Sequence, residues 1–532
     1  MERDLIRPMG EEYQEYLRDE SRSAGWAESI SFPRTAEEVA AVLRRMSAQG
    51  TPVVFQGGRT GLAAGASPRG GHIMNLSRMD RVLGCRRQGE DFYFTLQPGL
   101  TLAALRKMIA GKSFQTQGWS AQSLEAYAAF CRAPEQFFTP DPTETSAALG
   151  GMASCNASGA RSFYYGSVRR YISALQIVLA DGDSLRLRRG ERFAQGRQGL
   201  LTTEGGRQIA VPIPGYRMPA AKNASGYYAE DDMDLIDLFI GGDGTLGAIT
   251  ELEIRLVPLP SAVWGAALFF DQEEKALRCV RLLRGEGEQG RALNLRPAAV
   301  EFFNGDALRI LRRQRQAGGV FAQIRPIPEQ YETAIYAELH SETEEDAVAR
   351  LLGLGRAMEL AGGREQDSWV ARSQAELDQM MFFRHAVPES VNMLIDRRKQ
   401  KDPTITKLGT DMSAPDWALE EIMAMYRRDL EEQRLESAVW GHIGNNHLHV
   451  NILPRDAEDY RKGQALYGRW AQAVAQMGGA VSAEHGVGKL KAGFLRTMYG
   501  DQAVRQMRRL KKAFDPQFLL NRGNLFEPEE NQ

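Results

Sequence analysis

The sequence predicts an α+β protein with two domains. Its 532 residues suffice for more than one domain, since single domains usually hold roughly 100–200 residues. Strand-like and helix-like apolar patterns follow one another along the chain, and Pro258-Leu-Pro260 interrupts them near the middle. We therefore expect a polar N-terminal extension (1–30), a first domain (31–260), a second domain (261–500) and a C-terminal segment (501–532).

The composition excludes several classes of protein. Positive and negative side chains nearly cancel, giving a net charge of −2, which argues against nucleic-acid binding through an overall basic field. No apolar run approaches the ~18 residues that a membrane span needs, and the first residues lack the apolar core of a signal peptide. The four cysteines lie far apart with no CxxC pair, so neither an iron–sulfur cluster nor a thiolate zinc site is expected. We expect a cytoplasmic protein with no nucleic-acid partner and no transmembrane segment.

The first domain opens with a helix. Thr35 and Glu38 have the spacing of a capping box, and apolar residues follow at helical intervals from Val39 to Met46. Apolar patterns then predict two strands and a further helix, at 52–55, 92–96 and 102–109.

Three glycine-rich segments follow apolar stretches of this domain. They occupy 56–65, 140–166 and 241–250, and we expect each to begin at the end of a strand, the third after 235–240. Glycine lets the backbone approach a ligand closely and presents successive N–H groups to an anion. A single segment of this kind is more often a tight turn, but three together favour one shared nucleotide.

The third segment contains the pattern G-x-G-x-x-G from Gly242 to Gly247, which also occurs in nicotinamide-dinucleotide folds. Those folds need a helix after the glycines, because the helix N-terminus binds the pyrophosphate. Here residues 248–257 have the alternation and the β-branched residues of a strand. We therefore reject a Rossmann site, and no Walker A sequence occurs.

The second domain alternates strand-like and helix-like segments. A capping-box pattern from Ser341 to Glu344 predicts the start of a helix. The charged run 396–402 is expected to be an exposed loop.

Four of the seven histidines lie between residues 442 and 485. Residues 438–453 are expected to form two strands around a turn at 444–445. Because side chains alternate along a strand, His447 and His449 lie on one face of the second strand and its apolar residues on the other. A two-residue turn sets His442 opposite His447, so that three imidazoles share one face.

An acid and a further histidine, Glu484 and His485, stand in a glycine-bounded turn downstream. Imidazoles and a carboxylate suit a divalent Zn, Mn or Fe ion. A single histidine is more often solvent-facing or hydrogen-bonded within the protein, but four in so short a stretch favour a metal site.

The glycine-rich segments resemble the FAD-binding loops of the vanillyl-alcohol oxidase/p-cresol methylhydroxylase flavoprotein superfamily. The resemblance rests on Gln56–Gly65, Asp141-Pro142, Leu149–Gly159, Tyr165-Gly166, Lys222–Gly226 and Gly241–Thr250. It implies a two-subdomain FAD-binding domain at 31–260, a substrate (cap) domain at 261–500 and a C-terminal segment that returns to the flavin. The FAD-binding residues that it implies are Gln56, Gly57, Gly58, Arg59, Thr60, Gly61, Leu62, Pro140, Asp141, Gly150, Gly151, Asn156, Ser158, Gly159, Tyr165, Gly166, Gly244, Thr245, Gly247, Ile249 and Asn521.

Two residues depart from the pattern of this superfamily. Arg59 stands where a small residue is common, and its charge is expected to add to the pyrophosphate site. Asp243 replaces the usual glutamate, and an acid there is expected to face away from phosphate. No histidine or cysteine stands at the usual place of covalent attachment, so the resemblance implies non-covalent FAD.

The C-terminal half resembles the FAD-dependent D-2-hydroxyacid dehydrogenases, which include D-lactate, glycolate and D-2-hydroxyglutarate dehydrogenases. The similar segments are Gly441–Asn451, Ser482–Gly488 and Phe514–Gly523. The resemblance implies His442, His449 and Glu484 as metal ligands and His485 as the catalytic base. This sequence departs from the family where Asp-Gly-Asn becomes Asn-Asn-His, so His447 is an extra imidazole that either joins or replaces a ligand.

The resemblance implies oxidation of a 2-hydroxy acid to the 2-oxo acid. The substrate hydroxyl and one carboxylate oxygen chelate the cation, which lowers the pKa of the hydroxyl. A neutral His485, with an unperturbed pKa of ~6.5, then removes the proton while hydride passes from Cα to the flavin. Arg384 matches the family's substrate arginine, and Lys407 is a weaker candidate for binding the carboxylate.

Two other functions stay open on the same scaffold. Residues 409–411 and 485–491 also resemble alkylglycerone-phosphate synthase, a non-redox FAD enzyme, although that family has a histidine where Glu484 stands. The alternative is a flavin-bearing electron-transfer subunit. Because no CxxC is present, electrons leaving FAD are expected to reach an external acceptor, either an electron-transfer protein or a quinone. Peripheral contact with a membrane and formation of a homodimer are both compatible with such an enzyme.

Overall fold

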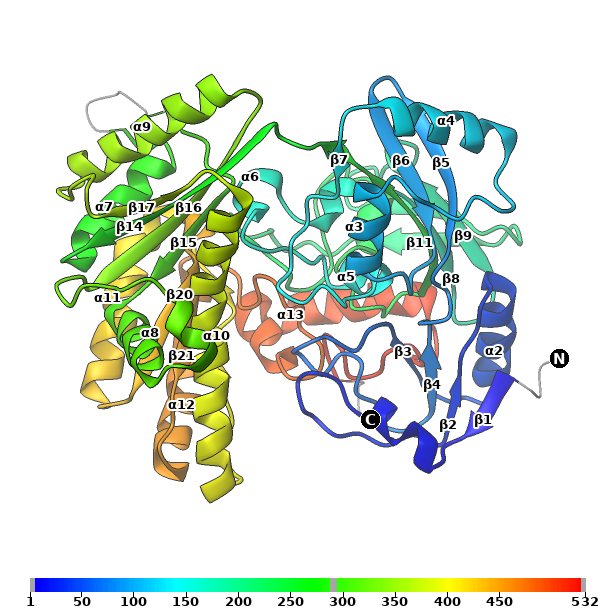
Figure 1. Ribbon diagram of the computed structural model, residues 1–532. Coiled ribbons are helices and arrows are strands. Elements are labelled where there is room, and N and C mark those ends of the chain that lie inside the picture. The colour runs from blue at the N-terminus through cyan, green and yellow to red at the C-terminus, as the bar shows by residue number, and fades with distance from the viewer. Residues whose placement is uncertain (1–4, 288–292, 294, 528–532) are drawn as a thin grey trace.

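The computed structural model describes residues 5–287, 293 and 295–527 of the chain. They form an N-terminal lobe and a C-terminal lobe side by side, and the last long helix crosses back to the first lobe (Figure 1). Each lobe combines sheets with helices, so the predicted α+β class with two domains is confirmed.

Two sheets form the core of the N-terminal lobe. In spatial order, the smaller sheet consists of β1 (Ile6–Pro8), β2 (Ser29–Ser31), β4 (His72–Asn75) and β3 (Val53–Gln56). The larger, antiparallel sheet consists of β5 (Val82–Gln88), β6 (Asp91–Leu96), β12 (Ala248–Arg255), β8 (Ile172–Val178) and β9 (Ser184–Arg188). Smaller elements of the lobe are α2 (Ala36–Ala48), α3 (Leu102–Ala110), α4 (Ala121–Arg132), β7 (Gln136–Phe137), α5 (Leu149–Ser154), α6 (Ser162–Tyr165), β10 (Gln198–Thr202), β11 (Gln208–Pro212) and β13 (Val257–Pro258).

The early helix and strands lie where the sequence predicts them. The Thr35 side chain accepts a hydrogen bond from the Glu38 backbone N–H and so caps α2. The apolar face of α2 packs against β3 and β4 through a buried cluster that includes Val39, Val53 and Met74. Strand β12 directly follows the glycine pattern at 242–247, which confirms that no Rossmann helix starts there.

The expected N-terminal extension is instead part of this lobe. Strand β1 pairs antiparallel with β2, and Leu5 and Ile6 pack on the cluster beneath α2. The following 3₁₀ turn, Glu11–Leu17, presents the carbonyl oxygen of Tyr16 to the Gln56 side chain at 2.7 Å. Backbone hydrogen bonds make much of the contact between this segment and the lobe, so the segment needs few apolar residues. Its polar composition therefore gave no sign of the contact.

One antiparallel sheet forms the centre of the C-terminal lobe. In spatial order its strands are β17 (Ser368–Ala371), β14 (Ala262–Phe270), β16 (Thr333–Ser341), β15 (Ala299–Phe303), β20 (Ser437–His442), β21 (His447–Ile452) and β18 (Leu408–Gly409), while β19 (Met412–Ser413) also pairs with β21. Helices α7 (Glu273–Leu283), α9 (Glu344–Leu360), α11 (Leu419–Glu432) and α12 (Ala457–Gln476) share a buried apolar cluster with one face of the sheet. Helices α8 (Gly305–Ala317) and α10 (Gln374–Lys401) share another cluster with the opposite face.

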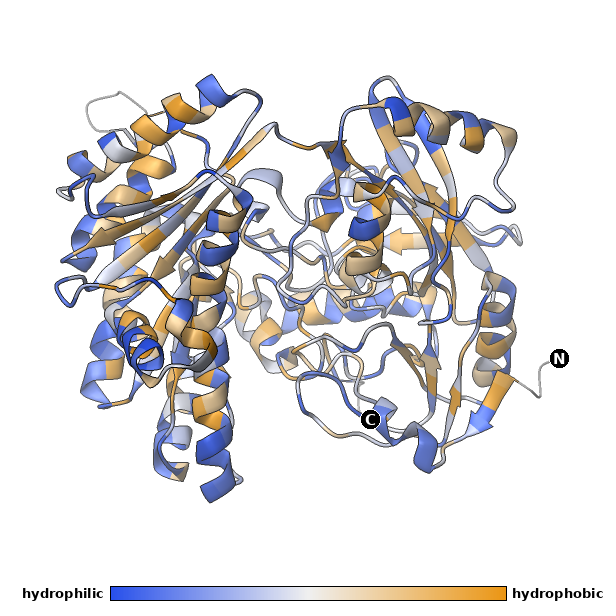
Figure 2. Cartoon of the chain, viewed as in Figure 1, coloured by the Kyte–Doolittle hydropathy of each residue, from blue (hydrophilic) through white to orange (hydrophobic). Residues whose placement is uncertain are grey.

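Hydrophobic and hydrophilic residues alternate along these helices (Figure 2), and their buried apolar residues pack against the sheet. Part of the sheet face that carries α8 and α10 is polar, because Glu301, Glu338 and His442 alternate with apolar residues that point to the other cluster. This polar part lies toward the N-terminal lobe, where Arg161 pairs with Glu338 at 2.7 Å.

The C-terminal segment returns to the N-terminal lobe as predicted. Helix α13 (Ala492–Phe514) bends at Gly500 and contributes Leu495, Val504 and Phe514 to the main core of that lobe. Beyond the helix, the backbone N–H of Asn521 donates to the Val53 carbonyl at 2.8 Å.

Two local expectations are wrong. Residues 396–402 are not a loop, because α10 continues to Lys401; arginine, lysine and glutamine favour helices, and here they cover an exposed helix end. Residues 235–238 form a 3₁₀ turn rather than a strand, and their side chains are buried in the core of the lobe. A short apolar run is compatible with either state, so periodicity alone did not separate them.

Candidate active site

The three glycine-rich segments meet inside the N-terminal lobe. The backbone N–H of Asp243 donates to the Ser154 carbonyl at 2.8 Å and so joins the third segment to α5. A Cβ atom on Gly58 would lie 2.7 Å from the Ser146 carbonyl, so glycine is needed for this close approach. Asn521 joins the first and third segments: its side chain accepts from a β3 backbone N–H at 2.8 Å and donates to the Asp243 carbonyl at 2.7 Å.

The residues present fit a dinucleotide at this junction. The hydroxyl of Ser158 is buried without a hydrogen-bond partner among the described residues. Gly159 lies against Asp141, where a Cβ atom would come within 2.2 Å of the Asp141 carbonyl oxygen. Apart from Asn521, the other predicted FAD-binding residues lie on the same three segments, with Tyr165 at the end of α6 and Ile249 on β12.

The two departures from the superfamily pattern have definite partners. The Arg59 guanidinium pairs with Glu15 at 2.9 Å and lies over the Tyr16 ring, so its charge is directed toward the N-terminal turn rather than left free. The Asp243 carboxylate accepts from the Gly488 backbone N–H at 2.7 Å, and burial raises its pKa to about 6. Asp243 thereby ties the third glycine segment to the 484–488 turn.

The predicted histidine hairpin is present as β20 and β21. His442 is the cross-strand partner of His447, and Trp440 is the partner of His449, as the sequence pattern requires. The connection is wider than predicted: Ile443–Asn445 form a 3₁₀ turn, and Asn446 takes a left-handed conformation with φ +49°. The register is unchanged, so the three imidazoles share one face.

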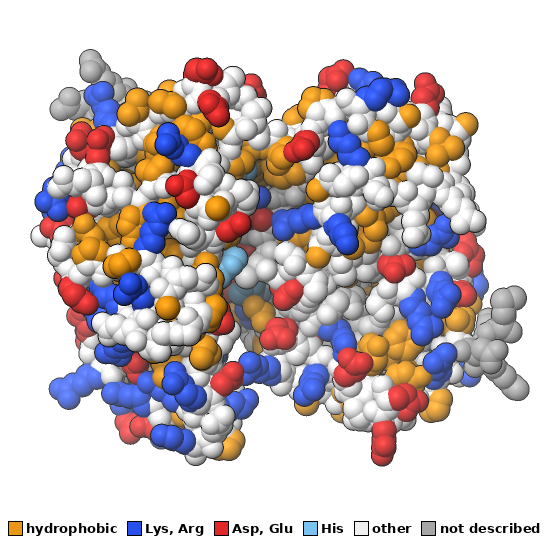
Figure 3. Space-filling model, in the orientation of Figure 1, with side chains coloured by type: hydrophobic (Ala, Val, Ile, Leu, Met, Phe, Trp, Pro, Cys, Tyr) orange, Lys and Arg blue, Asp and Glu red, His pale blue; other side chains and the backbone are white. Residues whose placement is uncertain are grey.

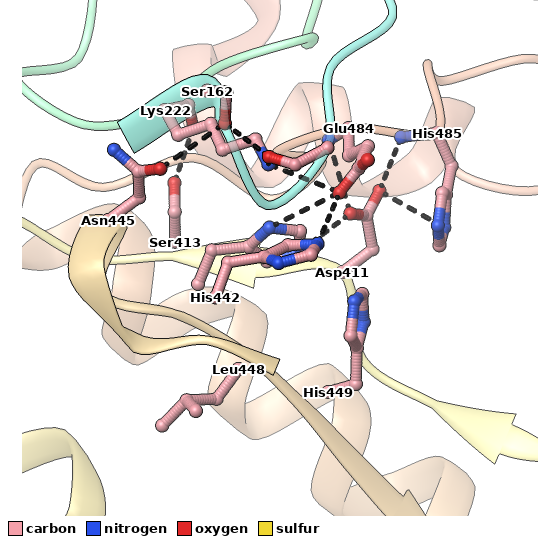
Figure 4. Close-up of polar contacts among 12 residues, drawn as sticks. Ser162, Lys222, Asp411, Ser413, His442, Asn445, Leu448, His449, Glu484 and His485 are labelled. Carbon is pink, nitrogen blue, oxygen red and sulfur yellow. Dashed lines mark hydrogen bonds and ion pairs between the residues drawn. The ribbon is translucent and has the colours of Figure 1, made fainter. Parts of the chain in front are cut away.

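Three imidazoles and one carboxylate converge. His442, His447, His449 and Glu484 each offer one ligand atom, and these four atoms lie within 4.8 Å of one another. The Glu484 carboxylate is 3.1 Å from His442 Nε2 (Figure 4). It is also 3.6 Å from His447 Nδ1. Such a group of nitrogen and oxygen donors suits a divalent ion of the Zn, Mn or Fe type.

Each imidazole is fixed through its other ring nitrogen. His442 Nδ1 lies 2.6 Å from Glu301, and His449 Nδ1 lies 3.0 Å from the Thr410 carbonyl. His447 Nε2 lies 3.0 Å from an Asp411 oxygen, and neither nitrogen of this buried ring forms a hydrogen bond within the described residues. Histidine metal ligands are typically oriented by a carboxylate or carbonyl on the distal nitrogen, so this arrangement fits a metal.

Charges around the cluster set the protonation of its members. Although burial favours a neutral carboxyl, Lys222 and His442 hold the pKa of Glu484 well below its usual range. Burial, aided by Lys222, lowers the pKa of His447 to about 4, and burial with its neighbouring imidazoles lowers the pKa of His449. The neutral rings of His447 and His449 beside an ionised carboxylate are states that bind a metal, whereas Glu301 outweighs burial and raises the pKa of His442.

Asp411 organises the turn that carries Glu484 and His485. It accepts hydrogen bonds from the backbone N–H groups of these two residues at 3.1 and 3.0 Å. It also accepts from Ser482 Oγ at 2.7 Å and pairs with Lys491 at 2.5 Å. The buried Asp411 carboxylate therefore fixes both the turn and His447.

His485 lies at the edge of the cluster with its ring stacked on His449, 5.8 Å between centroids. Its Nδ1 is 3.5 Å from Asp411, and its side chain is 27% exposed. Burial lowers the pKa of His485 despite the Asp411 charge, so the ring is neutral near pH 7. Figure 3 shows the surface hollowed between the lobes, with a histidine visible in the hollow.

The two predicted carboxylate-binding residues differ in placement. Arg384 lies next to the cluster, because its Nε is 2.9 Å from Glu301, which also holds His442. Lys407 lies 5.8 Å from the Trp440 ring centroid and 3.3 Å from the Asn392 side chain, and burial lowers its pKa to about 8.

Two family models match parts of both lobes of the chain. Residues 259–525 match the C-terminal domain of FAD-linked oxidases, and residues 27–124 and 121–188 match an FAD-binding domain. The chain belongs to the FAD-linked oxidase family. It is therefore a flavin-dependent oxidoreductase.

Curated relatives of this FAD-linked oxidase are similar along their length. D-2-hydroxyglutarate dehydrogenase of Xanthomonas citri pv. viticola is 28% identical over 512 residues, covering 94% of this chain and 90% of the relative. D-lactate dehydrogenase of Anaerostipes hadrus is 27% identical (97% and 94% covered), and glycolate oxidase subunit GlcD of Bacillus subtilis is 22% identical (94% and 89% covered).

Two solved structures share the fold of this FAD-linked oxidase at low identity. p-Cresol methylhydroxylase aligns with a TM-score of 0.65 at 14% identity, covering 100% of this chain and 95% of that one. Alkyldihydroxyacetonephosphate synthase aligns with a TM-score of 0.60 at 13% identity, covering 97% and 82%. At this identity, the two structures establish only the fold of the oxidase.

Three charged residues that complete the site of this oxidase are not predicted from the sequence. Lys222 lies 3.1 Å from Glu484, Glu301 bridges Arg384 and His442, and Asp411 holds the 484–488 turn. Lys222 and Asp411 stood within the similar segments, which was the available signal, whereas Glu301 stood in an apolar strand without any motif.

Among the described residues, none of the helices combines the length and the apolar character that crossing a membrane requires.

Proposed function

We propose that this FAD-linked oxidase is a metal-assisted dehydrogenase that oxidises a 2-hydroxy acid of the D-lactate, glycolate or D-2-hydroxyglutarate class to the 2-oxo acid. The observation that carries the proposal is the convergence of three anchored imidazoles with Glu484, on a turn hydrogen-bonded to the third glycine segment. The names of the curated relatives support the same class of substrate.

The residues that would hold the two groups are distinct. The three glycine-rich segments with Ser158 and Asn521 would hold FAD without a covalent bond, and His442, His447, His449 and Glu484 would hold the cation. When bound, FAD supplies the hydride acceptor and a divalent Zn, Mn or Fe ion supplies a Lewis acid for the substrate hydroxyl.

His485 is the proposed base. Asp411 lies beside its Nδ1 and so favours the tautomer with a proton on that atom, which leaves Nε2 free to accept the hydroxyl proton of the substrate. The lowered pKa of His485 keeps Nε2 unprotonated near pH 7. The proton thus goes to His485 as the Cα–H bond gives up its electron pair.

Arg384 would orient the carboxylate next to the reacting hydroxyl. Its guanidinium is fixed by Glu301 yet keeps its terminal nitrogens available, and a planar guanidinium matches a carboxylate. Lys407 is the second cation proposed for this carboxylate. Electrons leaving the flavin would pass to an external acceptor, an electron-transfer protein or a quinone.

Anaerobic bleaching of the flavin tests the proposal. The holoenzyme is mixed with D- and L-2-hydroxy acids, before and after removal of metal with a chelator. We expect one enantiomeric series to bleach the flavin, chelation to abolish bleaching, and His485→Ala to retain FAD but lose bleaching. Bound flavin that no 2-hydroxy acid reduces would favour the alkylglycerone-phosphate-synthase-like or electron-transfer alternative, and full reduction of His485→Ala would remove the base.

A further inference from the structure

Two arginines from different lobes face the same part of the sheet of the C-terminal lobe. Arg161 is the N-cap residue of α6 in the N-terminal lobe, and its Nε lies 2.7 Å from Glu338 on β16. Arg384 lies on α10, and its Nε is 2.9 Å from Glu301 on β15. The Arg161 side chain is 28% exposed and the Arg384 side chain 11% exposed.

The terminal nitrogens of both arginines are unused. Within the described ranges, no hydrogen bond involves an Nη atom of Arg161 or Arg384. Arg86 shows the usual alternative, since it spends both Nε and Nη2 on the two oxygens of Glu253.

The glutamates explain why this two-point pairing does not form. The second oxygen of Glu338 accepts from the Tyr336 hydroxyl at 3.1 Å, and the second oxygen of Glu301 is 2.6 Å from His442. Each glutamate therefore binds its arginine through Nε alone. The free edge of a guanidinium carries two parallel donors that match one carboxylate.

The strand register sets how far the free guanidinium edges of Arg384 and Arg161 lie from the histidine cluster. Glu301 is opposite Tyr336, and Glu338 is two residues further along β16, so the glutamates are diagonal neighbours about 7–8 Å apart on one face. Arg384 is next to the cluster through Glu301 and His442. Arg161 is bound to Glu338, the diagonal neighbour of Glu301, and therefore lies farther from the cluster.

We propose that Arg161 binds a second carboxylate of the substrate, so that the enzyme acts on a short 2-hydroxy dicarboxylic acid. This rests on the proposed function and names its substrate class. The carboxylate beside the hydroxyl binds Arg384, and the distal carboxylate binds the free edge of Arg161. The Asp141 carboxylate is 3.9 Å from Arg161 Nε, and with Glu301 and Glu338 it disfavours a doubly charged phosphate at this place.

The network behind Arg161 holds it in position. His340 lies 2.7 Å from the oxygen of Glu338 that Arg161 also contacts, and the Tyr165 hydroxyl lies 2.7 Å from the other His340 nitrogen. Glu338, His340 and Tyr165 are thus positioning residues that tie the arginine to both lobes.

Substrate preference of the holoenzyme tests the inference. Flavin reduction is measured with malate, 2-hydroxyglutarate and 2-hydroxyadipate against lactate and 2-hydroxybutyrate, in both configurations. We expect one dicarboxylate to exceed every monocarboxylate at least tenfold in kcat/KM. Arg161→Met should lower kcat/KM for that dicarboxylate about 10–100-fold, the cost of one charged hydrogen-bonded contact, with a loss on lactate at least tenfold smaller. Arg161→Lys, which keeps the charge but not the fork, should fall between.

Arg22→Ala is the matched control, because Arg22 also joins the lobes, through Asp396 at 2.9 Å, in an exposed place. It should leave the preference unchanged. Equal losses on both substrates in Arg161→Met would show a purely structural bridge and overturn the inference. Monocarboxylates or a phosphorylated 2-hydroxy acid as the best substrate would also overturn it while the proposed function stands, whereas no reduction by any 2-hydroxy acid would be a failure of the proposed function itself.

Discussion

Replacing Glu301 by glutamine removes one charge from the centre of the site while keeping its shape. The side chain is 4% exposed and contacts Arg384 at 2.9 Å and His442 at 2.6 Å. Although burial opposes ionisation, Arg384 and His442 lower the pKa of Glu301 from 4.5 to about 2. A shift of this size corresponds to about 3 kcal/mol of interaction with the charged form.

Glu301→Gln should therefore lower the free energy of unfolding by about 3 kcal/mol, because Arg384 remains buried without its partner. It should also weaken divalent-ion affinity by about 10–100-fold, since His442 loses the carboxylate that orients it. Urea unfolding and a chelator competition titration measure the two effects, and flavin content should not change.

Glu389→Gln is the control, because Glu389 is an exposed glutamate on α10, the helix that carries Arg384. It should alter neither quantity. Unchanged ion affinity in Glu301→Gln would refute the view that Glu301 orients a metal ligand. Unchanged stability would refute the charge coupling of Glu301 with Arg384 and His442.

Three further substitutions test separate parts of the structure. Asn521→Ala removes the two hydrogen bonds that tie residue 521 to β3 and to the third glycine segment, and should cost about 1–3 kcal/mol in urea unfolding and reduce flavin retained on gel filtration; full retention would contradict its role. His447→Asn should weaken divalent-ion affinity at least tenfold with flavin content unchanged, and equal affinity in a chelator titration would exclude His447 as a ligand. His72 is buried and its pKa is lowered by burial to about 3, so the neutral ring stabilises the fold above pH 6.5 and that stability is lost as pH falls toward 3. Relative to His72→Asn, the wild type should lose about 1.4 kcal/mol per pH unit below 6.5 in urea unfolding, and parallel pH profiles would contradict this.

Local patterns predicted the parts of the molecule that depend on neighbouring residues. The cap of α2 at Thr35 and the pairing of His442 with His447 follow from spacing within a few residues. The charged end of α10 was wrongly expected to be a loop, because charge marks exposure but does not distinguish a helix surface from a loop.

The residues that complete the site depend on contacts between distant segments. Glu301 is 141 residues from His442, and Asp411 is 74 residues from His485. Nothing near Glu301 in the sequence distinguishes it from any other acid on a strand. Only the strand order β16-β15-β20 brings it behind the imidazole.

The cluster is assembled by both lobes at once. The 484–488 turn is held on one side by Asp411 of the C-terminal lobe and on the other by Asp243 of the third glycine segment. Lys222 reaches Glu484 from the N-terminal lobe, while the three imidazoles come from the sheet of the C-terminal lobe. A cation or substrate that binds the assembled cluster therefore also stabilises the contact between the lobes, because any ligand favours the state that binds it. The reacting groups and the glycine segments thus share one turn, and the geometry of proton removal depends on the docking of the two lobes.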